Sequence, residues 1–408
     1  MGSRRTKVTL FRAQETTLAN NQRRMPSIQN ARLVFPDRVV PNGWIAFENG
    51  TISGIGEGSA VPSASGESFD ARGLYLAPGF IDIHVHGGGG ADFLDATPEA
   101  IRTITGFHAA GGTTAIAPTA ATATYRQFER LLVAAERAAT VGRLLPVHLE
   151  GPHLSATKAG AQDKALFMPP DREQIDWVVD RASQIGTITV APELPGAIQF
   201  IQAGANAGIL MSAGHSEAMD EEMKDAADAG LGKVTHLFNA MSSAKKIGLF
   251  RQAGVLEFAL GAPELYCEVV ADGFHVSPTL LKLAYRAKGP DKIILVTDAL
   301  AGAGLPFGSR FRLGNYACKV GPGYGLLEDE SALAGSTARM IDLVRNITTL
   351  VGVPLYEAVR MASLTPAEAL RRSHDLGSLE SGKAADFVLF DDEFQVRRTI
   401  VAGETVFG

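Results

Sequence analysis

The feature that most limits the fold of this chain is a series of short apolar runs, each followed by a stretch with helical character. The runs span residues 79–84, 113–118, 146–150, 187–192, 208–214, 233–237, 266–271 and 292–298. Each has the length of one buried strand, and strands that alternate with helices are typical of a parallel sheet. Eight such units predict an α/β protein with a (β/α)8 TIM-type barrel. An open doubly wound sheet is the alternative. No G-x-G-x-x-G motif follows the first run, so a dinucleotide site has no support.

Local signals mark several helix boundaries. Thr97-Pro98 and Ser277-Pro278 each place a hydroxyl side chain at the N-cap and a proline at the first helical position. Residues 339–351 predict a further helix after the last apolar run. Thr365-Pro366-Ala367-Glu368 has the pattern of a capping box and predicts the start of another helix.

Both ends of the chain have a strand pattern that differs from the middle. Residues 44–55 predict a hairpin, because Asn49-Gly50 supplies the two positive-φ residues of a type I′ turn. Short strands bounded by a glycine recur near the C-terminus. We therefore expect residues 25–77 and 375–408 to form one small β-sandwich domain, and residues 78–374 to form the barrel domain.

The first 24 residues are basic, with six lysines and arginines against one acid, Glu15. No periodic apolar face is present there, so we expect a disordered extension. The alternatives are a transit peptide, the loose myristoylation pattern of residues 1–6, and a translation start at Met25.

Composition narrows the class of protein. The 408 residues carry a formal net charge of −6, which argues against a nucleic-acid partner. Two cysteines, Cys267 and Cys318, favour a reducing compartment, and we expect a cytoplasmic protein. No apolar run reaches membrane-spanning length, so no membrane partner is expected.

Histidines and carboxylates cluster where the predicted strands end. Catalytic residues of a TIM barrel lie at the C-terminal strand ends. Five of the nine histidines fall at these ends. His84 and His86 are two residues apart on a strand and therefore point to the same face, where neutral imidazoles can bind a metal. The full candidate set is His84, His86, Glu150, His215, His236, His275 and Asp298.

These residues lie in motifs that resemble the amidohydrolase superfamily and, within it, the N-acetylglucosamine-6-phosphate deacetylase family. The combination of His-Leu-Glu-Gly-Pro at 148–152 with His-Leu-Phe-Asn-Ala-Met at 236–241 is specific for that branch. Other matching stretches are residues 78–89, 112–114, 214–216, 271–276, 296–299, 333–336 and 377–387. The resemblance implies a (β/α)8 barrel with a small β-sandwich made from both chain ends, and a homodimer.

The chemistry of the donors and the resemblance together suggest a divalent metal, one or two per chain. Glu150, His215 and His236 form a two-histidine, one-carboxylate set that leaves a position open for water. His84 and His86 would hold a second metal with Glu150 as a bridge. Zinc or iron is expected, and manganese or cobalt is an alternative.

The implied reaction is hydrolysis of the N-acetyl amide of N-acetyl-D-glucosamine 6-phosphate, which yields D-glucosamine 6-phosphate and acetate. A bound metal lowers the pKa of water from about 15.7 to about 7. Asp298 lies at the metal site in this interpretation, accepts the proton of the water and later delivers it to the leaving amine. His275 hydrogen-bonds the acetyl carbonyl as its oxygen gains charge.

The expected substrate contacts rest on the resemblance. Asn239 and the backbone of Ala240 match positions that contact the sugar phosphate in the family, and Gln162 stands where many relatives have histidine. Relatives usually follow Asn-Ala-Met with an arginine that reaches the phosphate of the neighbouring subunit's substrate. The nearest cations here, and the expected phosphate ligands, are Lys245, Lys246 and Arg251.

Two other functions stay open from the sequence. The first is deacetylation of N-acetylgalactosamine 6-phosphate, or of another N-acyl sugar or amide, by an enzyme of the same superfamily. The second is a catalytically silent relative that serves in assembly. Silent relatives tend to lose ligands, whereas this chain keeps the complete set.

Overall fold

The computed structural model describes residues 26–58 and 68–408. The expected disordered extension, residues 1–24, lies outside the described residues. Within the described part of the chain, no helix is both long enough and apolar enough to cross a membrane.

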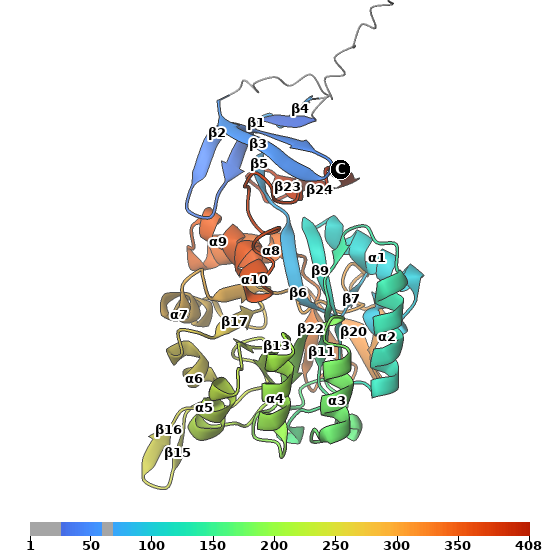
Figure 1. Cartoon of the computed structure of the whole chain (residues 1–408), viewed down its shortest axis with the longest axis vertical. Helices are drawn as coiled ribbons and strands as arrows, with labels where there is room; N and C mark the ends of the chain where they lie inside the picture. The colour runs from blue at the N-terminus through green and yellow to red at the C-terminus, as the bar shows by residue number, and fades with distance from the viewer. Residues whose placement is uncertain (1–25, 59–67) are drawn as a thin grey trace, which may run out of the picture.

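A nearly closed parallel barrel forms the body of the protein (Figure 1). Its strands pair in chain order, and the ring approaches closure where the main-chain N–H of Asp298 donates to the carbonyl of His84 (2.9 Å). The eight barrel strands are β6 (Phe80–Val85), β9 (Thr113–Ala120), β11 (Val147–Glu150), β12 (Ile185–Val190), β13 (Leu210–Ala213), β14 (Lys233–Val234), β17 (Tyr266–Val269) and β18 (Ile293–Leu295). The short β10 (Arg143–Leu144) also pairs with β9 and precedes β11. Each barrel strand overlaps one of the eight predicted runs.

Helices cover the outside of the barrel. They are α1 (Pro98–Ala109), α2 (Tyr125–Arg137), α3 (Arg172–Asp180), α4 (Ala197–Asn206), α5 (Asp220–Asp228), α6 (Val255–Gly261), α7 (Pro278–Lys288), α8 (Met340–Asn346), α9 (Leu355–Ala362) and α10 (Leu364–Ala369). A π-helical turn (Ile347–Val351) extends α8, and three 3-10 turns span Phe93–Asp95, Ala156–Lys158 and Lys164–Leu166. The Thr97 hydroxyl caps α1 by accepting from the Ala100 N–H (3.2 Å), as the sequence predicts.

The predicted capping box at Thr365–Glu368 is wrong. α10 already begins at Leu364, so Thr365 lies inside the helix and caps nothing. Its hydroxyl instead donates to the carbonyl of Pro290 (2.7 Å), and Glu368 pairs with Arg360. Tertiary contacts satisfy the two side chains that the local pattern assigned to a cap.

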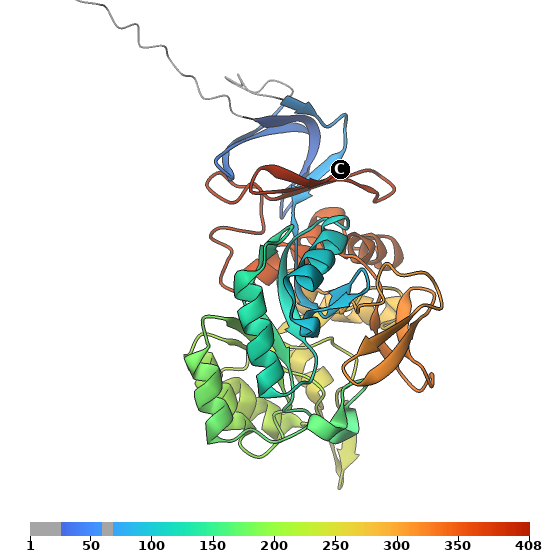
Figure 2. The same cartoon turned by 90° about the vertical axis from the view of Figure 1, so that its right-hand side faces the viewer.

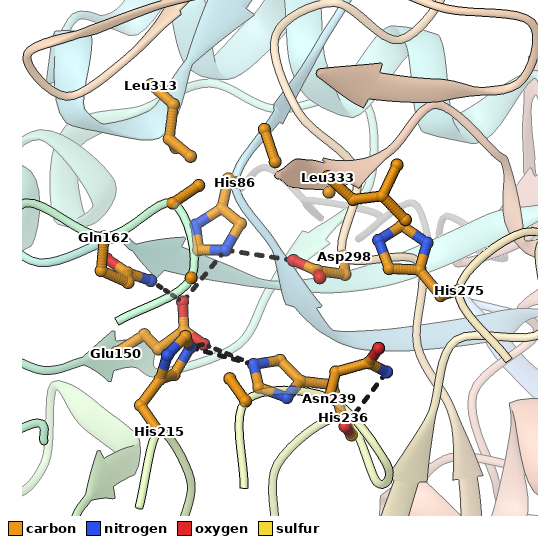
Figure 3. A pocket seen from close by; sticks show the side chains of 15 residues that line it. His86, Glu150, Gln162, His215, His236, Asn239, His275, Asp298, Leu313 and Leu333 are labelled. Atoms are coloured by element: carbon orange, nitrogen blue, oxygen red, sulfur yellow. Dashed lines mark hydrogen bonds and ion pairs between the residues drawn. The ribbon is translucent and has the colours of Figure 1, made fainter. Parts of the chain in front are cut away.

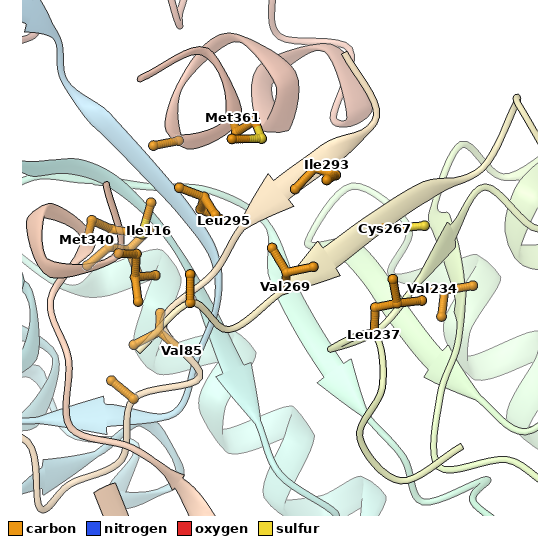
Figure 4. Close-up of a cluster of buried hydrophobic side chains, with 14 of the residues drawn as sticks. Val85, Ile116, Val234, Leu237, Cys267, Val269, Ile293, Leu295, Met340 and Met361 are labelled. Carbon is orange, nitrogen blue, oxygen red and sulfur yellow. The ribbon is translucent and has the colours of Figure 1, made fainter. Parts of the chain in front are cut away.

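The main core lies between the barrel and its helices. Val269, Leu295 and Met361 are each fully buried, and Figure 4 shows strand side chains facing helix side chains across this layer. Burying such a side chain contributes about 1.5–3 kcal/mol. This layer holds the strands in the register that brings their C-terminal ends together.

Strands from both chain ends join in one mixed sheet that curls over its own core (Figure 2). Its strands are β1 (Ser27–Val34), β2 (Val39–Glu48), β3 (Thr51–Glu57), β4 (Ser68–Asp70), β5 (Tyr75–Pro78), β23 (Phe387–Phe390), β24 (Val396–Val401) and β25 (Glu404–Phe407). Asn49 and Gly50 have φ values of 52° and 76°, as the predicted hairpin turn requires. The predicted fold class, a barrel with a small β structure from both chain ends, is confirmed.

Gly79 connects the sheet to the barrel without a loop. β5 ends at Pro78 and β6 begins at Phe80. A Cβ atom at Gly79 would lie 2.2 Å from the Thr114 side chain, so only glycine allows this close approach. The strand that carries His84 is therefore anchored in both parts of the molecule.

Three antiparallel insertions were not predicted. A small pair, β7 (Gly87–Gly88) and β8 (Ala91–Asp92), follows β6. A hairpin of β15 (Lys245–Ile247) and β16 (Phe250–Gln252) projects from the body in Figure 1. A four-stranded sheet follows β18 and consists of β19 (Arg310–Leu313), β20 (Tyr316–Val320), β21 (Tyr324–Leu327) and β22 (Leu333–Ser336). Their strands are too short to show a clear periodicity in the sequence.

Candidate metal-dependent active site

A cavity of about 170 Å³ opens at the C-terminal ends of the barrel strands. Figure 3 shows its polar side chains converging from different strands on one centre. The polar lining consists of His86, Glu150, Gln162, His215, His236, Asn239, His275 and Asp298. Leu313 and Leu333, from the four-stranded insertion, supply an apolar wall.

Glu150 stands at the centre of this group. Its Oε1 lies 3.1 Å from the Nε2 atoms of both His215 and His236. Its Oε2 lies 3.3 Å from Nε2 of His86. Glu150 is the last residue of β11 and is 1% exposed, so both of its oxygens are available only to groups inside the cavity.

His84 completes the group from inside the barrel, where it lies beneath the cavity and is fully buried. Its Nε2 lies 3.3 Å from His86 Nε2, 3.6 Å from Glu150 Oε1 and 3.5 Å from Asp298 Oδ1. The sequence therefore predicted correctly that His84 and His86 share a strand face. Two donor groups result, His84–His86–Glu150 and Glu150–His215–His236, with the donor atoms of each group within 4.8 Å of one another.

The donor set fits a divalent cation. His215 Nδ1 donates to the carbonyl of Lys158 (2.7 Å), and His84 Nδ1 donates to Glu268 (3.0 Å). Because carbonyl and ionised carboxylate oxygens only accept, Nδ1 is the protonated nitrogen in each neutral ring and Nε2 presents its lone pair. These Nε2 atoms face the Glu150 oxygens, and such a contact needs a positive charge, either a proton or a metal ion, between them. Nitrogen and carboxylate donors in this arrangement suit a first-row divalent metal.

The electrostatics of the cavity also favour positive charge. Burial lowers the pKa of His86, but hydrogen bonds with Asp298 and Glu150 outweigh it and raise that pKa to about 9. Burial raises the pKa of Glu150, but nearby His84 and hydrogen bonds with His215 and His236 lower it well below its usual value. The carboxylates are therefore ionised and ready to bind a cation.

Three of the converging residues have left-handed backbone conformations. The φ values are 48° at His215, 29° at His236 and 49° at Asp298. Such conformations cost on the order of 1–3 kcal/mol each for non-glycine residues. Backbone hydrogen bonds hold two of these turns: Leu237 N–H donates to the Glu268 carbonyl (2.7 Å), and Asp298 N–H donates to His84. The left-handed conformation directs each of these side chains from the end of its strand into the cavity.

Asp298 and His275 lie on the side of the cavity opposite Gln162 (Figure 3). Asp298 Oδ1 is 3.3 Å from His86 Nε2. His275 Nδ1 is 2.6 Å from Asp272 Oδ2, and the carboxylate can only accept this hydrogen bond. Burial lowers the pKa of His275, but the hydrogen bond and the charge of Asp272 outweigh it, so the pKa is raised. His275 is therefore a strong donor at the cavity.

Comparison with known proteins identifies the chemistry that this arrangement serves. Residues 75–406 match the amidohydrolase family. The chain belongs to the amidohydrolase family. It is similar to an N-acetylglucosamine-6-phosphate deacetylase of Vibrio furnissii, with 34% identity over 88% of this chain and 89% of that protein. It is also 36% identical to an N-acetylgalactosamine-6-phosphate deacetylase of Shewanella sp. (strain ANA-3), over 81% of this chain and 83% of that protein.

Solved structures agree with the sequence relatives. The crystal structure of N-acetylglucosamine-6-phosphate deacetylase from Pasteurella multocida has a TM-score of 0.86 to this chain at 31% identity. The match covers 93% of this chain and 99% of that one. The amidohydrolase described here is therefore a hydrolase of the N-acetylglucosamine-6-phosphate deacetylase branch.

The expected substrate contacts of this amidohydrolase divide into two sets. Asn239, Ala240, His275 and Gln162 line the cavity. Gln162 is already engaged there, because its Nε2 donates to Glu150 Oε2 (2.5 Å) and its Oε1 accepts from the Thr122 N–H (2.7 Å). This contact orients the central carboxylate.

The three expected phosphate ligands lie elsewhere. Lys245 and Lys246 are on β15 and Arg251 is on β16, and all three are exposed. The structure does not bring them to the cavity of the same chain. Lys245 lies 3.9 Å from Glu217, which also pairs with Lys158 (3.3 Å).

Glu268 is the main residue of the amidohydrolase site that sequence reasoning missed. It lies on β17, touches His84 and forms an ion pair with Lys233 of β14. Burial raises the pKa of Glu268, but Lys233 and His84 lower it to about 2. A charged residue in each of two predicted strand runs, Lys233 at the start of one and Glu268 inside the other, was the signal available in the sequence.

Proposed function

We propose that this amidohydrolase hydrolyses the N-acetyl amide of N-acetyl-D-glucosamine 6-phosphate to D-glucosamine 6-phosphate and acetate. The observation that carries the proposal is the convergence of four histidines and two carboxylates on one cavity at the barrel mouth. The relatives supply the substrate class, because those named above are amino-sugar-phosphate deacetylases. A silent role in assembly is disfavoured, since an assembly protein has no need for this strained and buried donor set.

The cofactor we propose is a divalent metal, one or two per chain. Glu150, His215 and His236 would hold one ion, and His84 and His86 would hold a second that shares Glu150, with Asp298 beside both groups. Zinc or iron suits these donors, and manganese or cobalt is the alternative. Bound there, the metal supplies Lewis-acid activation of water and of the amide carbonyl.

Asp298 handles the proton in the proposed reaction. Its carboxylate accepts a proton from water as the water oxygen attacks the carbonyl carbon of the N-acetyl group. The same carboxyl group then gives that proton to the amide nitrogen as the C–N bond breaks. The second proton of the water passes from the new carboxyl group to the amine, so acetate and the ammonium form of the amino sugar leave, and Asp298 returns to its ionised form.

His275 stabilises the charge that develops during this attack. Its Nδ1–H donates to Asp272, and the raised pKa of His275 favours the protonated ring, whose Nε2–H is the donor directed to substrate. A donor at the carbonyl oxygen becomes more favourable as that oxygen gains negative charge. Asp272 therefore orients the ring and strengthens the donor.

The phosphate requires cations that the described residues of one cavity do not provide. No lysine or arginine is among the cavity-lining residues. The β15–β16 hairpin carries Lys245, Lys246 and Arg251, and its tip exposes Leu249 and Phe250 by 83% and 75%. Exposed apolar side chains beside cations are typical of a surface that another chain covers. We propose a homodimer in which the hairpin of a second copy approaches the phosphate.

A substrate panel tests the proposed function. Acetate release is measured for N-acetylglucosamine 6-phosphate, N-acetylgalactosamine 6-phosphate and plain N-acetylglucosamine, with and without added divalent metal. The proposal expects the highest kcat/KM for the first substrate. A preference for the second would move the function to the alternative that the Shewanella relative represents. Equal kcat/KM for phosphorylated and plain sugars would contradict a phosphate site. A cytoplasmic location stays a prediction.

A further inference from the structure

A buried ion pair lies inside the barrel beneath the candidate metal site. Lys233 of β14 and Glu268 of β17 are both 0% exposed, and the Lys233 ammonium bonds Glu268 Oε1. Cys267 Sγ lies 3.9 Å from the Ala259 carbonyl of the outer helix α6, so the next residue on the strand, Glu268, points into the barrel, where it meets Lys233. Two charges buried without access to water are costly, and breaking such a pair usually destabilises a protein.

The second oxygen of Glu268 reaches the histidine ligands. Glu268 Oε2 accepts from His84 Nδ1 (3.0 Å) and from the main-chain N–H of His236 (3.3 Å). One carboxylate thus contacts a member of each donor group. A carboxylate that accepts from the outer nitrogen of a histidine fixes the ring orientation and tautomer, and makes the inner nitrogen a stronger metal ligand.

His84 is alone among the four histidines in this respect. His215 Nδ1 donates to a main-chain carbonyl, and within the described residues the Nδ1 atoms of His86 and His236 have no hydrogen-bond partner. The Glu268 carboxylate therefore strengthens metal binding on the His84 side of the site, which would hold the second ion.

We propose that Glu268, held in place by Lys233, is a positioning residue that allows the His84–His86 pair to bind the second divalent metal. The inference rests on the proposed metal-dependent function and extends it to a residue outside the cavity. Lys233 contributes by occupying one carboxylate oxygen, which leaves the other free for His84.

The decisive variant is Glu268→Gln. The Lys233 ammonium can only donate hydrogen bonds, so it would bind the oxygen of the new amide. The amide NH2 group would then face His84. His84 Nδ1 would then accept, its proton would move to Nε2, and the ring could no longer ligate. Loss of an outer-shell partner weakens metal binding by about 10- to 100-fold. We expect Glu268→Gln to bind the first metal normally and the second about 10- to 100-fold more weakly.

A paired variant separates this effect from misfolding. In Lys233→Met/Glu268→Gln no lysine competes for the amide oxygen, so the glutamine can accept from His84 again. We expect this variant to recover part of the second-metal affinity that Glu268→Gln loses. Asp386→Asn is the matched control, since it weakens another ion pair, which joins Asp386, just before β23, to the half-buried Arg143 of β10 (2.6 Å). That control should lower the melting temperature and keep wild-type metal binding.

Metal is counted by elemental analysis of the full chain after titration with Zn²⁺, and affinities are measured by competition with a chelator. Two Zn²⁺ ions in the wild type, one tightly bound ion in Glu268→Gln and partial recovery in the double variant support the proposal. Unchanged binding of two ions by Glu268→Gln would overturn it, and so would a wild type that binds only one. The metal count does not depend on turnover. Two ions in a wild type that hydrolyses no N-acetyl sugar phosphate would therefore refute the proposed function alone.

Discussion

Asp298→Asn is the perturbation that isolates the proposed proton carrier. Asn has the same shape, and asparagine and aspartate are among the residues that best tolerate left-handed backbone. The φ of 49° and the N–H bond to the His84 carbonyl should therefore persist. Glu150, His215 and His236 remain unaltered, so at least one metal should stay bound.

The expected loss of rate follows from the role of the carboxylate. General base catalysis contributes about 10²- to 10⁴-fold, which corresponds to about 3–5 kcal/mol of barrier. Asparagine cannot accept the proton from water, so kcat should fall by that factor. KM should change little, because the side chain keeps its volume at the cavity.

The assay is acetate release at saturating substrate, with metal content and melting temperature measured on the same sample. Asp171→Asn is the matched control: Asp171 caps α3, and asparagine caps a helix equally well, so its activity should equal that of the wild type. Asp298→Asn with full metal content and kcat within a few-fold of the wild type would refute the assignment of Asp298.

Three further predictions concern the metal, the phosphate and pH. A His84→Ala/His86→Ala double variant should retain about one metal per chain by elemental analysis, since Glu150 and its two partners form a separate group; undiminished metal would exclude the pair as ligands. Lys245→Ala and Arg251→Ala should raise KM for the 6-phosphate sugar far more than for the plain sugar, and an equal effect on both would place these cations on a merely solvated hairpin. Burial lowers the pKa of His153 to about 4. A histidine in the unfolded chain has a pKa of about 6.5, so below that pH the unfolded state binds more protons than the folded state. The contribution of His153 to stability is complete above a pH of about 6.5 and is lost as the pH falls toward 4. The loss between pH 7 and pH 5 is about 2 kcal/mol, and a His153→Gln variant should show a correspondingly smaller drop in melting temperature; an unchanged pH dependence would contradict the buried neutral histidine.

The sequence by itself determined the elements that depend on local periodicity. Eight apolar runs became the eight barrel strands, and Asn49-Gly50 became the turn between β2 and β3. The shared face of His84 and His86 follows from the period of two along a strand. Glu150, His215 and His236 each lie at the end of a predicted strand, so the sequence alone assigned them to one candidate site, and the structure brings them together.

Only the tertiary structure decided which of these groups meet across strands. Glu268 lies 184 residues from His84 in sequence, and their contact depends on the barrel bringing β17 and β6 to the same interior layer. Gln162 lines the cavity, as expected of a substrate contact, and only the fold shows that its amide also binds Glu150. The physical reason is that side-chain alternation is a property of one strand, whereas cross-barrel neighbours are set by register and closure, which depend on the packing of the whole core.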